Sequence, residues 1–149
     1  MTKPIPWIIG VGNPMRGDDA AAAAVVAHLR GDDIEAFVFD GDGAELMEMW
    51  RNQGRVILID AAHSGAPVGT LRRFEANKEV LPSHFFRHSS HQFGVAEAVE
   101  MARTLDQLPG ELIIYAIEGA DFTLGAQLSP EVELAVFDTV DHIKADIGH

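Results

Sequence analysis

The chain has 149 residues, of which 47% are hydrophobic and 23% are charged, and these proportions predict one globular domain spanning residues 1–149. The formal net charge of −12 opposes the phosphate backbone of nucleic acids, so we expect no nucleic-acid partner, and the absence of cysteine excludes disulfides and thiolate metal sites. No apolar stretch reaches the length of a membrane span, and residues 1–7 lack a secretory hydrophobic region, so we expect a cytoplasmic protein without a membrane partner.

The first half of the chain alternates predicted strands with predicted helices. Residues 5–11 form an apolar run that stops at a Gly-Asn-Pro turn, as a buried strand does. An alanine-rich helix is predicted to begin at Asp18 or Asp19 and to end at Gly31. The next predicted elements are a strand at 35–40, a helix at 44–51 and a strand at 55–59. This order predicts an α/β three-layer sandwich, with a mostly parallel twisted sheet and helices on both faces, of the phosphorylase/hydrolase-like kind.

The second half opens with a segment that has no clear helical period. Residues 63–90 contain glycines, prolines and a possible strand at 70–74, which indicates a functional loop region. Ser89 and Gln92 match a capping box, so a helix is predicted from there to about Leu105. The last predicted elements are a buried strand at 111–117 and an amphipathic helix that starts at 129–130 and runs through 143.

Three aspartates follow the first and third predicted strands. In open α/β sheets, ligands bind outside the carboxyl ends of the strands, where neighbouring connections leave on opposite faces. If the spatial order of the strands is two, one, three, the turn that contains Asp18 and Asp19 faces the same crevice as Asp60. One aspartate can cap the first helix, but two cannot share one N-cap. The other is then available for the crevice, and the residues alone do not decide which.

His91 is the histidine best placed for chemistry. It falls in the first turn of its helix if Ser89 is the cap, and the positive end of the helix dipole disfavours imidazolium there. A neutral imidazole has the lone pair that a late transition metal needs. His84 and His88 lie nearby in the sequence and could form a local cluster, although exposed loop histidines are the simpler interpretation.

The glycine turn after the first strand also suggests dinucleotide binding, and Asp40 stands where a ribose-binding acid would be. The fingerprint fails at its third glycine, because Met15 occupies that position. The sequence therefore does not favour a nicotinamide cofactor.

Taken together, the motifs resemble the hydrogenase maturation endopeptidases, which remove a C-terminal extension from the nickel-containing large subunit after metal insertion. The segments that carry the resemblance are IGVGNP with RGDD (residues 9–14 and 16–19), DG (40–41), LIDA (58–61) and SHQFG (90–94). Their order and spacing span about the first two thirds of the chain. The SHQFG segment is fairly specific for this family by itself. The glycine turn is a weak indicator alone and becomes informative only in combination with the other segments.

The resemblance implies a site and a substrate. By position, the family's metal-contacting residues fall on Asp19, Asp60 and His91. These side chains would bind nickel carried by the substrate, a hydrogenase large-subunit precursor, and zinc or cadmium could occupy the same ligands. The enzyme would be a metal-recognising endopeptidase classed near the aspartic peptidases, in which a carboxylate or a metal-polarised water attacks the peptide bond.

The sequence departs from the family pattern at three places. Asp19 stands where many members have Glu, so its carboxylate would approach a metal from a closer backbone position. Residues 20–24 are all alanine where a glycine-containing stretch is common, and Asp42 replaces a frequent glycine. These differences bear on how a substrate tail would dock.

Two alternative functions stay open at this point. Peptidyl-tRNA hydrolases also begin with a strand and a Gly-x-Gly-Asn-Pro turn, but their catalytic histidine follows closely, whereas the first histidine here is His28 inside the predicted first helix. A noncatalytic module that stores or senses a metal through Asp19, Asp60 and His91 is the alternative from a different class. The sequence alone does not separate that module from a protease.

Overall fold

The computed structural model describes residues 5–30, 34–82 and 94–148 of the chain. Its strands are β1 (Trp7–Val11), β2 (Glu35–Phe39), β3 (Arg55–Ala62), β4 (Leu71–Glu75) and β5 (Glu111–Glu118). Its helical elements are the 3-10 turn η1 (Gly17–Ala20), α1 (Ala21–Leu29), α2 (Gly43–Trp50), α3 (Val95–Thr104) and α4 (Pro130–Ile147). Within these ranges no helix combines the length and the apolar character needed to cross a bilayer.

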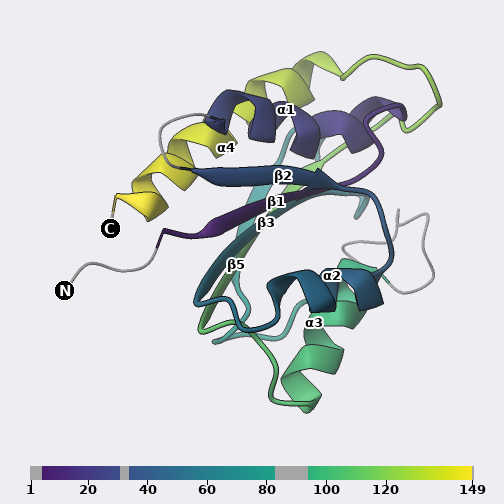
Figure 1. Cartoon of the computed structure of the whole chain (residues 1–149). Helices are drawn as coiled ribbons and strands as arrows, with labels where there is room; N and C mark the ends of the chain where they lie inside the picture. The colour runs from purple at the N-terminus through teal and green to yellow at the C-terminus, as the bar shows by residue number, and fades with distance from the viewer. Residues whose placement is uncertain (1–4, 31–33, 83–93, 149) are drawn as a thin grey trace.

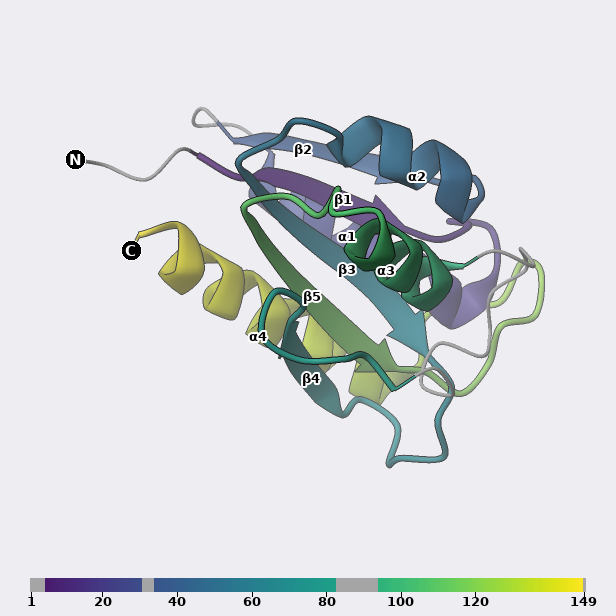
Figure 2. The same ribbon diagram turned by 90° about the horizontal axis from the view of Figure 1, so that it is seen from below.

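The strands form one sheet in the order β2-β1-β3-β5-β4. β1 pairs in parallel with β2 and β3, and β3 pairs in parallel with β5, whereas β4 runs antiparallel along the edge of β5 (Figure 2). Helices α1 and α4 lie on one face of the sheet, and α2 and α3 lie on the other (Figure 1). The predicted α/β sandwich is therefore confirmed, and the first three strands have the order two, one, three under which Asp19 and Asp60 were expected to face one crevice.

The central strands are buried on both faces, and the alternation of their side chains divides the core in two. Ile57 and Ile59 of β3 belong to the apolar cluster that includes residues of α1 and α4. Val56 and Leu58, which alternate with them along the strand, belong to the cluster that includes residues of α2 and α3. Neighbouring side chains of a strand point to opposite faces, so a continuous apolar run is what a strand between two helical layers requires.

The alanines of α1 allow this helix to lie very close to β1. Ala21 and Ala22 are buried, and a Cβ placed on Gly10 of β1 would come within 2.9 Å of the carbonyl oxygen of Ala22. The same Cβ would lie 2.8 Å from a methyl carbon of Val26, which is closer than real Cβ contacts. Gly10 and the alanine run therefore fit each other, and together they set the start of α1 against the end of β1.

Two predicted helix starts are wrong. Residues Gly17–Ala20 form a 3-10 turn, so the first α-helix begins at Ala21 and not at Asp18 or Asp19. Helix α3 begins at Val95, because Gly94 has extended backbone angles, so a continuous helix from Ser89 is not formed. His91 is consequently not in the first turn of α3, and Ser89 and His91 themselves lie outside the described residues. The possible strand at 70–74 is confirmed as β4 with a shift of one residue, and the structure places it at the edge of the sheet.

Candidate active site

The candidate site lies at the carboxyl edge of the sheet, where β1 and β3 end side by side. The two strands are parallel neighbours, with Gly10 of β1 in register with Ile59 of β3. Asp60 follows Ile59, and Asp19 lies in η1, which packs against β3. Both aspartates are half-buried, and the charge of Asp19 acts on the carboxyl of Asp60. The structure therefore brings these two predicted site residues together.

Asp60 is the more perturbed carboxyl of the pair. Burial raises its pKa well above the usual value, and the negative charge of Asp19 raises this pKa further. The hydrogen bond that Asp60 Oδ1 accepts from the Ala61 amide, at 2.8 Å, acts in the opposite direction and is outweighed. Two carboxyls in such a site favour either a shared proton or a bound cation, because ionising both without compensation is costly.

The glycine turn after β1 wraps around Asp19. Gly12 has a φ of +144°, and a Cβ there would lie 2.4 Å from the carbonyl oxygen of Asp19 and 3.1 Å from its Oδ1. The amide of Asn13 donates a hydrogen bond of 2.7 Å to Asp19 Oδ2. The absence of a side chain at Gly12 thus gives the turn room for a carboxylate, and the backbone amide beside it fixes that carboxylate at the edge of the sheet.

Asp18 has a different role from its neighbour. It is fully buried, and its carboxylate accepts hydrogen bonds from the amides of Ala120, Asp121 and Ser129 at 2.7, 3.0 and 2.7 Å and from the Ser129 hydroxyl at 2.8 Å. Burial alone would raise the pKa of Asp18, but these hydrogen bonds prevail and lower it. Asp18 is therefore a buried anchor for the β5–α4 loop, and Asp19 is the aspartate of the turn whose charge reaches Asp60.

Neither aspartate caps a helix with its side chain, since η1 and α1 both lack a side-chain hydrogen bond at their N-caps. Backbone contacts instead complete the joint between the two loops. The Asp18 amide donates to the Asp121 carbonyl at 2.8 Å. Gly17 has a φ of +52°, and a Cβ there would lie 2.1 Å from the same oxygen, so the loops touch through a position that excludes side chains.

Glu118 is a buried acid at the same edge that the sequence reasoning did not single out. It ends β5, is 2% exposed, and accepts hydrogen bonds from the Ser64 amide at 2.9 Å and the Ser64 hydroxyl at 2.6 Å. The amide of Gly119 also donates to the carbonyl of Ala62 at 3.0 Å. These bonds hold the loop that follows β3 and Asp60. The sequence feature that could have identified Glu118 is an acid at the end of an otherwise apolar strand. A carboxylate buried there needs hydrogen-bond donors nearby, so it indicates a second loop packed against the strand end.

Asp42, one of the departures from the family pattern, has a local structural role. Its Oδ1 accepts a hydrogen bond of 3.1 Å from the Glu45 amide, which makes Asp42 the N-cap of α2. Asp42 thereby accepts a hydrogen bond from a backbone amide that, with glycine at this position, would have only water as its acceptor.

Two oxygen ligands fall short of a complete metal site. Within residues 5–30, 34–82 and 94–148, no group of three or more His, Asp or Glu side chains is arranged to hold a metal. His91, the third predicted ligand, lies outside the described residues, as do His84 and His88. The paired carboxylates suit a divalent cation by charge, but the described residues supply no third ligand beside them.

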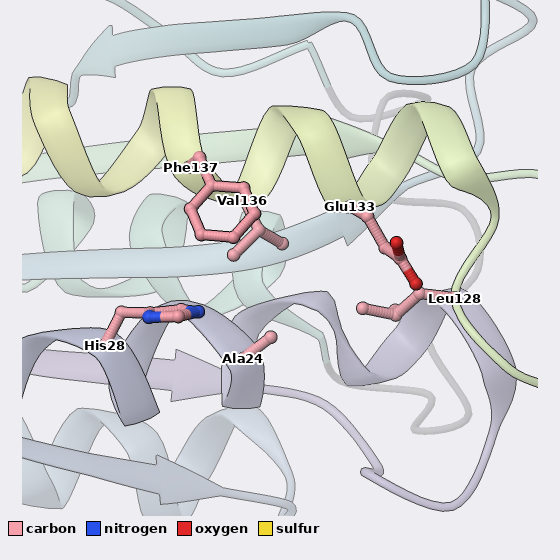
Figure 3. Close-up of a pocket in the computed structure, with 6 residues that line it drawn as sticks. All are labelled: Ala24, His28, Leu128, Glu133, Val136 and Phe137. Carbon is pink, nitrogen blue, oxygen red and sulfur yellow. The ribbon is translucent and has the colours of Figure 1, made fainter.

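A separate groove lies on the outer surface between α1 and α4, away from the paired acids. It has a volume of about 200 Å³, and Figure 3 shows His28 and Phe137 facing each other across it, with their ring centroids 5.0 Å apart. Most of its lining is apolar, and its residues are Ala24, His28, Leu128, Glu133, Val136 and Phe137. Because none of the predicted site residues lines it, the groove is not the candidate active site.

Comparisons with known proteins agree with this fold and these motifs. A family model described as hydrogenase maturation protease matches residues 26–146 of the chain. The match contains Asp60 and His91, whereas Asp19 precedes it. A curated relative, the hydrogenase expression/formation protein HupD of Thiocapsa roseopersicina, is 21% identical over 140 residues. The alignment covers 90% of this chain and 63% of that protein, so the chain spans less than two thirds of its relative's length.

Solved structures with similar folds include two hydrogenase maturation enzymes. The hydrogenase maturating endopeptidase HybD from E. coli superimposes with a TM-score of 0.80 at 23% identity, covering 97% of this chain and 92% of that one. The [NiFe] hydrogenase maturation protease HybD from Thermococcus kodakarensis gives a TM-score of 0.66 at 20% identity, covering 94% and 97%. At these identities the superpositions establish a shared fold, which is the three-layer arrangement described above.

Proposed function

Since the chain belongs to the hydrogenase maturation protease family, we propose that it is an endopeptidase that removes the C-terminal extension of a nickel-loaded [NiFe]-hydrogenase large-subunit precursor. The observation that carries this proposal is the pair of carboxyls, Asp19 and Asp60, held at the carboxyl edge of the sheet with their charges in conflict. A conflict of this kind is relieved when a cation binds, and the cation that defines this substrate is its nickel.

In this proposal Asp19, Asp60 and His91 recognise the nickel that the precursor brings. The Asn13 amide holds the Asp19 carboxylate in place, and the hydrogen bond from Ala61 orients the carboxyl of Asp60. His91 would add the nitrogen ligand, which suits a late transition metal better than oxygen ligands alone. An apoprecursor would lack the cation that draws the two carboxyls together, so it would bind poorly.

We also assign proton transfer during peptide hydrolysis to Asp60, a carboxylate at the edge of the sheet where the scissile bond would lie. A water molecule attacks the carbonyl carbon of the scissile bond, and the Asp60 carboxylate takes its proton. That proton then passes to the leaving nitrogen as the carbon–nitrogen bond breaks, and Asp60 returns to its starting state.

We place this activity in the cytoplasm, with no membrane and no nucleic acid as partner. The formal charge of −12 supports the exclusion of nucleic acid, because a phosphate backbone would be repelled. The substrate precursor is the one partner that the proposed chemistry requires.

The deciding experiment compares a purified large-subunit precursor with nickel and without it, each mixed with the protein and followed by mass spectrometry. We expect shortening only of the nickel-loaded precursor, and loss of shortening with Asp19→Ala, Asp60→Ala or His91→Ala. Asp141→Ala is the matched control, since Asp141 is an exposed carboxylate on α4, and it should process normally.

Two other outcomes would contradict the proposal. Equal cleavage of the nickel-free precursor would show that substrate recognition by Asp19 and Asp60 does not depend on the nickel ion. Tight binding of free nickel without cleavage of the cognate precursor would instead identify a noncatalytic metal-binding module, since a protease that relies on its substrate's metal should bind free nickel weakly.

A further inference from the structure

Two large apolar side chains are exposed on the loops that border the paired acids. Met15 is 65% exposed on the β1–α1 turn, and Leu124 is 62% exposed on the β5–α4 loop. Their backbones lie side by side, because the amide of Gly125 donates a hydrogen bond of 2.7 Å to the carbonyl of Met15. Single exposed apolar residues are ordinary, but two on adjoining loops beside a candidate active site indicate a contact surface.

Hydrogen bonds hold the backbone beneath Met15 and Leu124. The Met15 amide donates a hydrogen bond to Asn13 Oδ1 at 2.9 Å. The backbone amide of Asn13 in turn donates a hydrogen bond to Asp19 Oδ2. The buried carboxylate of Asp18 ties the turn to the β5–α4 loop at both ends of that loop. A backbone that is already fixed loses little further conformational freedom when a partner covers the side chains that it carries.

Phe122 continues this surface toward the end of β3. Its ring contacts the edge of the imidazole of His63 in a T-shaped arrangement, with centroids 5.5 Å apart. A Cβ on Gly119 would lie 2.8 Å from the Phe122 ring, so the glycine leaves the space that the ring occupies. His63 comes three residues after Asp60, and Met15 comes four residues before Asp19.

We propose that Met15, Phe122 and Leu124 form an apolar rim that docks apolar side chains of the hydrogenase large-subunit precursor beside its nickel-bearing segment. The inference rests on the proposed function and adds to it the surface by which the enzyme holds its substrate. The paired acids and the cation would give recognition of the metal state, and the rim would give affinity for the protein that carries the metal. Met15 and Leu124 are exposed and Phe122 is half-buried, and aromatic and methionine side chains are enriched in such protein-binding surfaces.

The choice of a protein partner follows from the placement of the rim. Its three residues come from two connections that leave the sheet at the edge where the acids lie, and its aromatic member contacts the connection that follows Asp60. A polypeptide that presents a metal to both acids would therefore approach the edge of the sheet from which these connections leave. Burial of exposed apolar side chains during that approach is favourable.

The test is steady-state processing of the nickel-loaded precursor by the double variant Met15→Ser/Leu124→Ser. We expect KM to rise about tenfold with kcat changed by less than about twofold, because the rim contributes binding and touches no reacting atom. Leu134→Ser, at a position 70% exposed on α4, is the matched control and should leave both constants unchanged. A photo-crosslinking residue at position 15 should link to the precursor, whereas one at position 134 should not.

The outcomes separate this inference from the proposed function. If the unaltered protein does not process the precursor, the proposed function is wrong, and the inference that the rim binds this precursor is wrong with it. If the unaltered protein processes the precursor and the double variant has an unchanged KM, the rim inference fails alone. An equal rise in KM for Leu134→Ser would also overturn it, since the effect would then follow surface polarity in general. Unchanged thermal unfolding of the double variant is the required folding control.

Discussion

The carboxylate of Asp18 accepts hydrogen bonds from both the amide and the hydroxyl of Ser129, which lies 111 residues further along the chain. Ser129 directly precedes α4, so the bond joins the turn after β1 to the start of the last helix. A carboxylate with four donors in a buried setting is strongly stabilised in its charged form. The two loops that border the candidate site therefore behave as one unit.

Replacing Asp18 should destabilise the fold more than replacing either site acid. We expect Asp18→Ala to lower the free energy of unfolding by about 3 kcal/mol, because several buried donors lose their acceptor. Urea denaturation monitored by circular dichroism measures this change. The exposed acid Asp141 serves as the comparison, and an equal loss for Asp141→Ala would contradict the anchoring role.

The contribution of Asp18 should also depend on pH in a defined direction. Its pKa in the folded protein is below the usual 3.8, so the folded state favours the ionised form. The stabilisation is then complete above the unfolded-state pKa and is lost as the pH falls through the lower folded-state pKa. The stability difference between the natural protein and Asp18→Asn should accordingly be constant near neutral pH and shrink in strong acid. A difference that grows toward acid would have the wrong sign.

Asp60 should show the opposite linkage. Because its pKa is raised in the folded state, folding favours the protonated form, and this stabilisation is lost as the pH rises from the unfolded-state value through the folded-state value. At neutral pH, above the unfolded-state pKa, the carboxyl of Asp60 is therefore a cost to the fold. We expect Asp60→Asn to stabilise the protein at pH 7 on the order of 1 kcal/mol while it abolishes processing, the usual exchange at a functional site.

Carboxyl NMR titration would test the coupling between the two acids directly. Removal of the neighbouring charge in Asp19→Asn should lower the pKa of Asp60, and burial should keep it above that of an ordinary aspartate. An Asp60 titration that is unchanged by Asp19→Asn would show that the two carboxyls do not share one site.

Gly12→Ala should disturb the placement of Asp19. The added Cβ would lie 2.4 Å from the Asp19 carbonyl oxygen at a φ of +144°, so both contact and backbone strain are expected. We predict a loss of about 3 kcal/mol in unfolding free energy, at the upper end of the usual cost of such strain. Gly65→Ala is a matched control, because Gly65 has a φ of +91° with no atom within 4 Å of an added Cβ. Similar losses in the two variants would mean that the contact with Asp19 contributes nothing.

Tyr115 should titrate abnormally late. Its buried hydroxyl donates to Asp146 of α4 and accepts from Arg73 Nε at 3.2 Å, and burial followed by the Asp146 charge raises its pKa above the ordinary value. Tyr115 is the only tyrosine of the chain, so ultraviolet titration reports on it alone. Its stabilising contribution is present below the unfolded-state pKa near 10.0 and is lost as the pH rises through the higher folded-state value. A normal tyrosine titration in the folded protein would contradict this environment.

The strands and the mostly parallel sheet could be predicted because they depend on local patterns. The apolar runs of β1, β3 and β5 are continuous, and helical segments separate the first strands, whereas the positions of β4 and β5 in the sheet were not predicted. The start of α3 could not be predicted in the same way. Ser89 and Gln92 form a plausible local cap, yet the helix begins at Val95 after an extended Gly94. A capping motif shows where a helix is able to start, and long-range packing decides where it does.

The candidate site shows the same division between local and distant information. Adjacent aspartates in the glycine turn pointed to the crevice, but their separate roles depend on Ala120, Asp121 and Ser129, which no local pattern connects to the turn. Glu118 was overlooked because its partner, Ser64, lies 54 residues away in a loop without a motif. The prediction that His91 belongs to the site stays a prediction, since it lies outside the described residues.

The anchoring of Asp18 by the β5–α4 loop has a consequence for the order in which the protein assembles during synthesis. Both site acids belong to the first 60 residues, but the turn that carries Asp19 gains its last partner when Ser129 leaves the ribosome. A nascent chain that stops before this serine contains both proposed site acids, Asp19 and Asp60, but lacks a contact that anchors their neighbour Asp18. The turn beside the acid pair is therefore fixed late, although all five strands of the sheet end before residue 119.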